Sequence, residues 1–146
     1  MRRIPESTTL LFDLWALANA THAALDEALR DSGLTADEFA VYSVLRRPDG
    51  RTPSELAAAM QLPATTVSSV VRRLEQRGHV ERATDPTDRR SSRLTLTPAG
   101  EAAHARARKA FRPFLARVEA GLGIPVDRAR DVLDRIDEAV RAAADA

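Results

Sequence analysis

Residues 52–97 read TPSELAAAMQLPATTVSSVVRRLEQRGHVERATDPTDRRSSRLTLT, and this stretch decides the fold that the sequence predicts. Thr52 precedes Pro53 and lies three residues before Glu55, which is the pattern of a capping box with proline at the first helical position. A helix is therefore expected to begin here. Pro63 prevents this helix from continuing, so a turn and a second helix should follow.

The second predicted helix is amphipathic and should end at Gly78. Its apolar side recurs at i, i+3, i+4 and i+7 and consists of Val67, Val70, Val71 and Leu74. The opposite side carries hydroxyl groups near its start and guanidinium groups further on, on Thr65, Thr66, Ser68, Ser69, Arg72, Arg73 and Gln76. Small polar residues at a helix N-terminus let the helix backbone approach a DNA phosphate closely. The free N–H groups of the first helical turn can then bind that phosphate. A helix-turn-helix places such a face in the major groove of DNA.

After the second helix, the periodicity of the sequence changes from the helical repeat to a repeat of two residues, which is typical of β-strands. Residues 80–84 and 93–97 alternate in this way and predict the two strands of a hairpin. The segment between them contains turn-forming residues, with Arg89 and Arg90 near its tip. A hairpin beside a recognition helix makes a winged helix. Its arginines are expected to enter a narrow minor groove, where the electrostatic potential is more negative.

Each of these features taken alone is common outside DNA-binding proteins. An apolar helical stripe usually belongs to a core, and arginine-rich segments are usually solvated surface. The order of capped helix, turn, helix and arginine-tipped hairpin within about 45 residues is more specific and favours DNA binding. A winged helix that serves as a protein-interaction scaffold is the alternative, and it would use the same core without the arginines. Salt separates the two hypotheses, because phosphate-driven binding weakens steeply as salt is added.

The motifs in this stretch resemble those of the MarR family of bacterial transcription regulators. The matching residues are Leu74-Glu75-x-Arg77-Gly78-x-Val80-x-Arg82, Asp85-Pro86-x-Asp88-Arg89-Arg90 and Leu94-x-Leu96-Thr97-x-x-Gly100. Two positions depart from the family pattern. The family often carries arginine at the position of Ser69 and aspartate at the position of Arg72.

The resemblance implies a homodimer that binds a palindromic operator in double-stranded DNA, as a repressor that a small-molecule effector releases. Bases or nearby phosphates would be met by Thr65, Thr66, Ser68 and Ser69. Backbone phosphates would be met by Arg72 and Arg73, with Ser54 close to phosphate and with Arg89 and Arg90 in the minor groove. In the family the effector pocket lies between the dimer helices and the winged domain, and its candidates here are Trp15, Asn19, His22 and Tyr42.

The distribution of charge supports this interpretation. From Arg72 to Arg93 seven arginines stand against four acidic residues, a local charge of +3, whereas the whole chain of 146 residues carries +1. The remainder therefore sums to −2, so positive charge is concentrated where DNA binding is predicted.

Several classes of protein are not expected. The chain has no cysteine, no apolar run of about 20 residues and no signal-peptide pattern, so we expect a cytoplasmic protein without disulfides or membrane contact. The three histidines lack metal-ligand spacing, and no nucleophile–base pair or phosphate-binding loop is present. We therefore expect no catalytic residues, no metal, no cofactor and no enzymatic activity.

The predicted fold class is mainly α with a small β-hairpin wing, an α+β winged helix-turn-helix flanked by long N- and C-terminal dimerisation helices. One MarR-like domain is expected over residues 1–146. Its DNA-binding region spans residues 35–100, and its helical dimerisation region spans residues 8–32 and 98–146. The N-terminal helix should begin near residue 7 or 8. It is apolar on more than one side, and its second apolar side should be buried against a partner chain.

Overall fold

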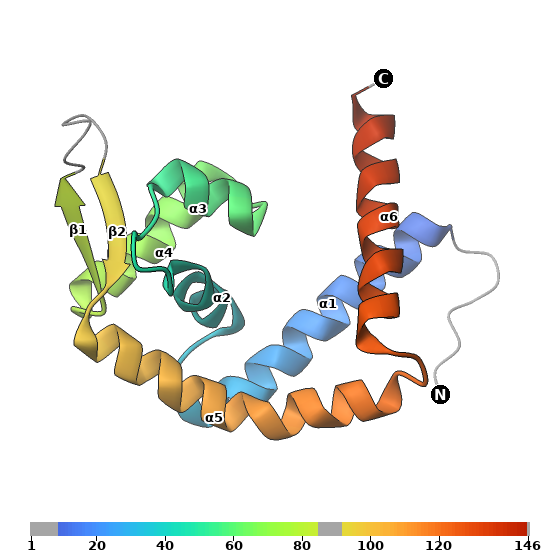
Figure 1. Ribbon diagram of the computed structural model, residues 1–146, viewed down its shortest axis with the longest axis horizontal. Coiled ribbons are helices and arrows are strands. Elements are labelled where there is room, and N and C mark those ends of the chain that lie inside the picture. Colours follow the sequence, from blue (N-terminus) through green and yellow to red (C-terminus); the bar gives the residue numbers. More distant parts are fainter. Residues whose placement is uncertain (1–8, 85–91, 146) are drawn as a thin grey trace. The chain divides into compact units, whose positions relative to one another are not determined.

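A computed structural model describes residues 9–84 and 92–145 (Figure 1). Contacts divide the chain into two compact units, Met1–Phe111 and Arg112–Ala146. The division falls inside the long helix α5 (Pro98–Gly121), next to Pro113, which has no N–H to donate to the helix.

The first unit contains most of the helices and the only strands that the described residues form. Its elements are α1 (Leu10–Leu29), α2 (Ala36–Leu45), α3 (Pro53–Met60), α4 (Ala64–Gln76), β1 (Val80–Thr84), β2 (Ser92–Leu96) and the first part of α5. Helix α2 packs against α3 and α3 against α4, and the hairpin contacts all three (Figure 1). The second unit contains the rest of α5 and helix α6 (Val126–Ala144). This arrangement confirms the predicted fold class. None of the described helices has the length and apolar character that a membrane crossing requires.

Local hydrogen bonds explain where the helices begin. The hydroxyls of Thr35 and Thr52 accept from the backbone N–H three residues later, and the glutamate there accepts from the threonine N–H, so α2 and α3 both open with complete capping boxes. Helix α1 begins at Leu10, slightly later than predicted, because Thr9 is its cap and accepts from Phe12 N at 3.3 Å. A 3₁₀ turn, Arg30–Ser32, follows α1.

The hairpin is antiparallel, and Val80 pairs with Leu96. Strand β2 begins and ends one residue earlier than predicted, and its end at Leu96 is explained by the hydrogen bonds of Thr97. The Thr97 hydroxyl donates to Gly78 O at 2.7 Å and accepts from Gly100 N at 3.1 Å, so this residue joins the hairpin to the start of α5. The wing arginines predicted from sequence, Arg89 and Arg90, lie outside the described residues.

One glycine allows a third backbone segment to join the sheet. Arg51 pairs with Leu94, accepting from its N–H at 2.7 Å and donating to its carbonyl at 3.0 Å. Gly50 precedes this bridge with a φ of 61°, and a Cβ there would lie 2.5 Å from Leu94 O. Only glycine fits both the backbone conformation and the space.

The core of the first unit lies between the C-terminal end of α1, helices α2, α3 and α4, the hairpin and the start of α5. Its larger buried side chains are Leu29, Val41, Tyr42, Leu45, Leu56, Val67, Val71, Leu74 and Leu94. Two polar residues, Glu38 and His104, are buried with them. The apolar side of α4 is thus buried within the first unit. This burial determines which side of α4 faces outward.

Candidate nucleic-acid interface

Helix α4 presents two chemically distinct sides. Val67, Val70, Val71 and Leu74 are buried. The opposite side was predicted from sequence to contact DNA, and its residues are exposed except for the half-buried Thr66: they are Thr65, Ser68, Ser69, Arg72 and Arg73. The sequence prediction of this surface, called the DNA face below, therefore matches the observed burial. Ser54, the remaining predicted phosphate contact, is exposed in the first turn of α3.

The first turn of α4 suits an approaching anion. Its N-cap is Pro63, no side chain caps it, and the turn contains no acidic residue. The first N–H groups of a helix lack partners within the helix and carry partial positive charge. Hydroxyl groups from Thr65 and Thr66 stand beside them. Backbone and side chains at this end of the helix thus both offer hydrogen bonds to phosphate.

Ser69 has one of its hydrogen-bonding functions already occupied. Its hydroxyl donates to Thr66 O within α4 at 2.8 Å. Because a serine hydroxyl has a single proton, the oxygen of Ser69 remains available as an acceptor on the DNA face. In this conformation Ser69 suits a donor on a base edge better than a phosphate oxygen.

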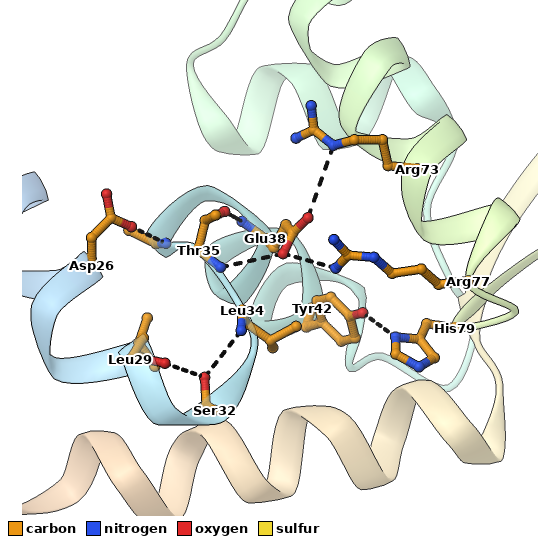
Figure 2. Close-up of polar contacts among 11 residues, drawn as sticks. Asp26, Leu29, Ser32, Leu34, Thr35, Glu38, Tyr42, Arg73, Arg77 and His79 are labelled. Carbon is orange, nitrogen blue, oxygen red and sulfur yellow. Dashed lines mark hydrogen bonds and ion pairs between the residues drawn. The ribbon is translucent and has the colours of Figure 1, made fainter.

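The C-terminal half of α4 is attached to α2 through a buried carboxylate, as Figure 2 shows. Glu38 Oε2 accepts from Arg77 Nη1 at 3.0 Å, and Glu38 Oε1 lies 3.9 Å from Arg73 Nε. The same carboxylate accepts from Thr35 N at 3.2 Å in the capping box of α2. The start of α2 is held in turn by α1, because Asp26 Oδ1 accepts from Ala36 N at 2.7 Å. Polar contacts therefore connect α1, α2 and α4 in series.

The base of the wing is also attached to α4. Arg82 of β1 donates from Nε to Glu75 Oε1 at 3.1 Å and from Nη1 to Ser92 Oγ at 2.9 Å. One side chain thus bridges the recognition helix and both strands of the hairpin. This arrangement orients the start of the wing relative to the DNA face.

Two histidines support the core between α2 and α5. His79 Nδ1 shares a hydrogen bond of 2.6 Å with the Tyr42 hydroxyl (Figure 2), while His104 stacks on Phe39 and Tyr42 and contacts Ser43 Oγ at 3.1 Å. Burial, followed by the nearby charge of Glu38, raises the pKa of Tyr42 to about 12. Burial also lowers the pKa of His104, and the charges of Arg46 and Arg108 lower it further.

Three of the four predicted effector-pocket residues, Trp15, Asn19 and His22, lie at i, i+4 and i+7 along α1. Trp15 is exposed on α1, where Asn19 donates to its carbonyl at 2.8 Å. His22 lies further along α1, with Nδ1 3.3 Å from Asp26 and Nε2 3.2 Å from Asp37.

The fourth of these residues, Tyr42, has no exposed surface and belongs to the core. A hollow of about 330 Å³ in the first unit is lined by other residues, namely Leu45, Arg46, Arg47, Pro48, Thr95, Leu96 and Glu101. The assignment of Trp15, Asn19, His22 and Tyr42 to an effector site stays a prediction.

Three residues that support the DNA face were missed in the sequence: Glu38, Arg77 and Arg82. Glu38 occupies the capping-box position of α2, a local pattern that gives no indication of contacts with α4. Arg77 and Arg82 belong to the motif Leu74-Glu75-x-Arg77-Gly78-x-Val80-x-Arg82, but their partners could not be identified from local spacing.

The architecture is that of a winged helix-turn-helix protein, and comparison with known proteins defines the family. A model described as MarR family matches residues 32–91. The HTH-type transcriptional repressor Rv2887 of Mycobacterium tuberculosis is 30% identical over 125 residues, which cover 86% of this chain and 90% of that protein. The chain belongs to the MarR family. Its relatives are regulators, which confirms the prediction that it is not an enzyme.

Two further relatives extend the comparison. The transcriptional activatory protein BadR of Rhodopseudomonas palustris is 33% identical over 94 residues, 62% of this chain and 54% of that protein. The chain spans about half to two thirds of the length of several such curated relatives. The crystal structure of the regulator MosR of M. tuberculosis in complex with DNA superimposes with a TM-score of 0.80 at 29% identity and covers 93% of this chain and 98% of that one.

Proposed function

We propose that this protein is a sequence-specific DNA-binding transcription regulator that places α4 in the major groove of its operator. The observation that carries the proposal is the exposed DNA face of α4, held outward by complete burial of the opposite side. The likeness to MosR, whose structure was solved with DNA, supports the same use of the fold.

The predicted roles of the side chains follow from their chemistry. Hydroxyl residues 65, 66, 68 and 69 meet base edges or adjacent phosphates, and Arg72, Arg73 and Ser54 contact the backbone. Arg89 and Arg90 enter the minor groove. Contacts to base edges provide specificity, while arginines on phosphate provide most of the salt-dependent affinity.

We further propose that the protein acts as a homodimer on a palindromic site. Helix α1 exposes the large apolar residues Leu10, Leu11, Phe12, Trp15 and Leu17. The second unit exposes Leu115, Val118, Leu122, Ile124, Val132, Leu133 and Val140. Exposed apolar surface of this extent marks an interaction site. A second copy packed on the helical region, residues 8–32 and 98–146, would leave α3, α4 and the wing to bind DNA. Twofold symmetry would present two α4 helices to successive half-sites.

The direction of regulation is proposed to be repression, relieved by a small-molecule effector. Rv2887, a relative matched over most of its length, is named a repressor, whereas BadR is named an activatory protein. The place of action is the cytoplasm, where bacterial DNA is found.

A selection experiment tests the DNA proposal. Random-sequence duplexes enriched by the wild-type protein should converge on a palindrome. The affinity for the selected duplex, measured by fluorescence anisotropy, should fall linearly on a log–log plot against salt with a slope of about −0.9 per phosphate neutralised. Failure to enrich any sequence, or binding to DNA that does not depend on salt, would contradict the proposal and favour a protein-interaction scaffold.

A further inference from the structure

Glu38 is the most deeply buried charged side chain among the described residues, and it does not belong to the DNA face. It completes the capping box of α2, but capping does not require burial. Glu55 completes the same motif at α3, and its side chain is 49% exposed, against 3% for Glu38. The burial of Glu38 therefore needs a second explanation.

The second set of partners of Glu38 comes from α4. Arg77 donates to one carboxylate oxygen at 3.0 Å, and Arg73 Nε lies 3.9 Å from the other. Arg73 and Arg77 are four residues apart and so lie on the same side of the helix. A buried carboxylate is unfavourable unless it is paired, and here one partner, Arg73, lies within α4 and the other, Arg77, is the residue that caps its C-terminus. The pairing therefore restrains α4 as well as Glu38.

Arg73 is the residue that connects this buried pairing to the DNA face. Its side chain is 52% exposed, and Figure 2 shows its terminal guanidinium nitrogens directed away from Glu38. A guanidinium is planar and offers donors along more than one edge. The Nε edge of Arg73 can thus face Glu38 while the terminal nitrogens remain available to a phosphate.

We propose that Glu38 is a positioning residue for DNA binding. Its buried carboxylate orients the guanidinium of Arg73, and through Arg77 the C-terminal half of α4, so that Arg73 meets an operator phosphate. Glu38 itself does not touch DNA. The inference rests on the proposed function, because it assigns Glu38 a role in binding the same operator.

Loss of the Glu38 carboxylate should affect specific and non-specific DNA binding differently. Loss of the Glu38 charge removes the restraint on Arg73 and should weaken operator binding, which needs one geometry. The same loss makes the protein more positive and should leave binding to unrelated DNA unchanged or stronger. The ratio of the two affinities is therefore the informative quantity.

Glu38→Gln is the main test, because glutamine keeps the length and can still accept from Thr35 N. Anisotropy with the selected operator duplex should show a dissociation constant raised on the order of tenfold, as for residues coupled in one ion-pair network. A scrambled duplex of equal length and composition should bind no more weakly than it binds wild type. Glu55→Gln is the matched control, and it should not weaken operator binding.

The energetic coupling between Glu38 and Arg73 shows whether Glu38 positions Arg73 or only stabilises the fold. In an Arg73→Ala background, Glu38→Gln should weaken operator binding less than it does in the wild-type background, because only the contact through Arg77 is then lost. Arg73→Lys provides an independent test if Glu38→Gln does not fold, because it keeps the positive charge and leaves Glu38 paired with Arg77. It should also weaken operator binding without weakening binding to the scrambled duplex.

Four results would overturn the inference while leaving the proposed function in place: unchanged operator affinity in a folded Glu38→Gln, unchanged affinity in Arg73→Lys, an equal loss in Glu55→Gln, or a full effect of Glu38→Gln in the Arg73→Ala background. A wild-type protein that prefers no duplex would overturn both proposals. The two failures are therefore distinguishable.

Discussion

In the proposed complex with DNA, the side chain of Ser69 limits which bases the DNA face can recognise. Its hydroxyl proton is committed to Thr66 O, which leaves one acceptor for a base edge. An arginine at this position would reach guanine with two hydrogen bonds, worth roughly 1–3 kcal/mol of discrimination. With serine, more of the specificity should depend on Thr65, the wing and the shape of the DNA.

Ser69→Arg should therefore raise overall affinity and shift preference toward guanine at one position in each half-site. Binding-site selection on wild type and variant in parallel measures both effects. Ala142→Arg, an exposed position on α6, adds the same charge and should not change the selected sequence. Identical sequence preferences for wild type and Ser69→Arg would show that Ser69 does not face the bases.

His104 makes the stability of the fold depend on pH. Burial and then Arg46 and Arg108 lower its pKa below the usual value near 6.5, while the charge of Glu101 opposes this shift. The unfolded chain therefore binds more protons than the folded chain as pH falls below about 6.5, and stability decreases in that window. Above that pH, both states hold a neutral imidazole and the effect disappears.

Comparison with His104→Phe isolates this contribution, since phenylalanine can stack on Phe39 and Tyr42 but cannot titrate. The unfolding free energy of the variant minus that of wild type should become more positive between pH 7.5 and pH 5.5, by at most about 1.4 kcal/mol per pH unit. Urea unfolding at one fixed protein concentration measures the difference. If it stayed constant or changed in the other direction, His104 would not be held neutral by the fold.

At the scale of elements, the proposed binding to both grooves of DNA requires a fixed orientation of the hairpin relative to α4. Arg82 connects α4 to both strands, and Thr97 connects the hairpin to α5. These contacts hold the base of the wing, and residues 85–91, DPTDRRS, include no large aliphatic or aromatic residue that a core would need. Residues at the tip should therefore affect DNA binding more than folding.

Replacing Arg89 and Arg90 together with alanine should leave the melting temperature nearly unchanged and weaken operator binding. The slope of log affinity against log salt should become shallower by about one unit for each lost phosphate contact. Anisotropy over a salt series measures the slope. The exposed pair Arg128 and Arg135 on α6, replaced in the same way, controls for lost charge. Equal effects of the two double variants would argue against a specific role for the wing.

At the scale of the whole molecule, the exposed apolar surface indicates assembly with a second chain. Helices α1 and α6 expose large apolar residues that neither unit covers by itself. Leu133 on α6 is 54% exposed, so a polar residue there should cost an isolated chain little. In a dimer interface the same residue would bury an unpaired charge, at a cost of about 3–5 kcal/mol.

Leu133→Asp should therefore produce a folded monomer with weak operator affinity. Light scattering at micromolar concentration, combined with circular dichroism, measures assembly and folding separately. Ala142→Asp is the matched control, because it lies nine residues later on the same helix, about two and a half turns away and so on the opposite side. A wild-type protein that is monomeric at this concentration would refute the dimer directly.

Local patterns in the sequence determined the elements and the DNA face. A capping box such as that at Thr52 involves residues three positions apart, and the stripe from Val67 to Leu74 repeats with the helical turn. Such interactions depend little on the rest of the fold, so they were predictable. The side of α4 that faces outward followed from the same periodicity, because burying four aliphatic residues exposes the opposite side.

The tertiary structure decided which distant residues meet. Glu38 and Arg77 are 39 positions apart, and Tyr42 and His79 are 37 apart. Glu38 and Glu55 occupy the same position in two similar capping boxes, yet one is buried and the other is half exposed. No local pattern distinguishes them, because burial depends on how α2 packs near α4, and the packing of helices is a property of the whole core.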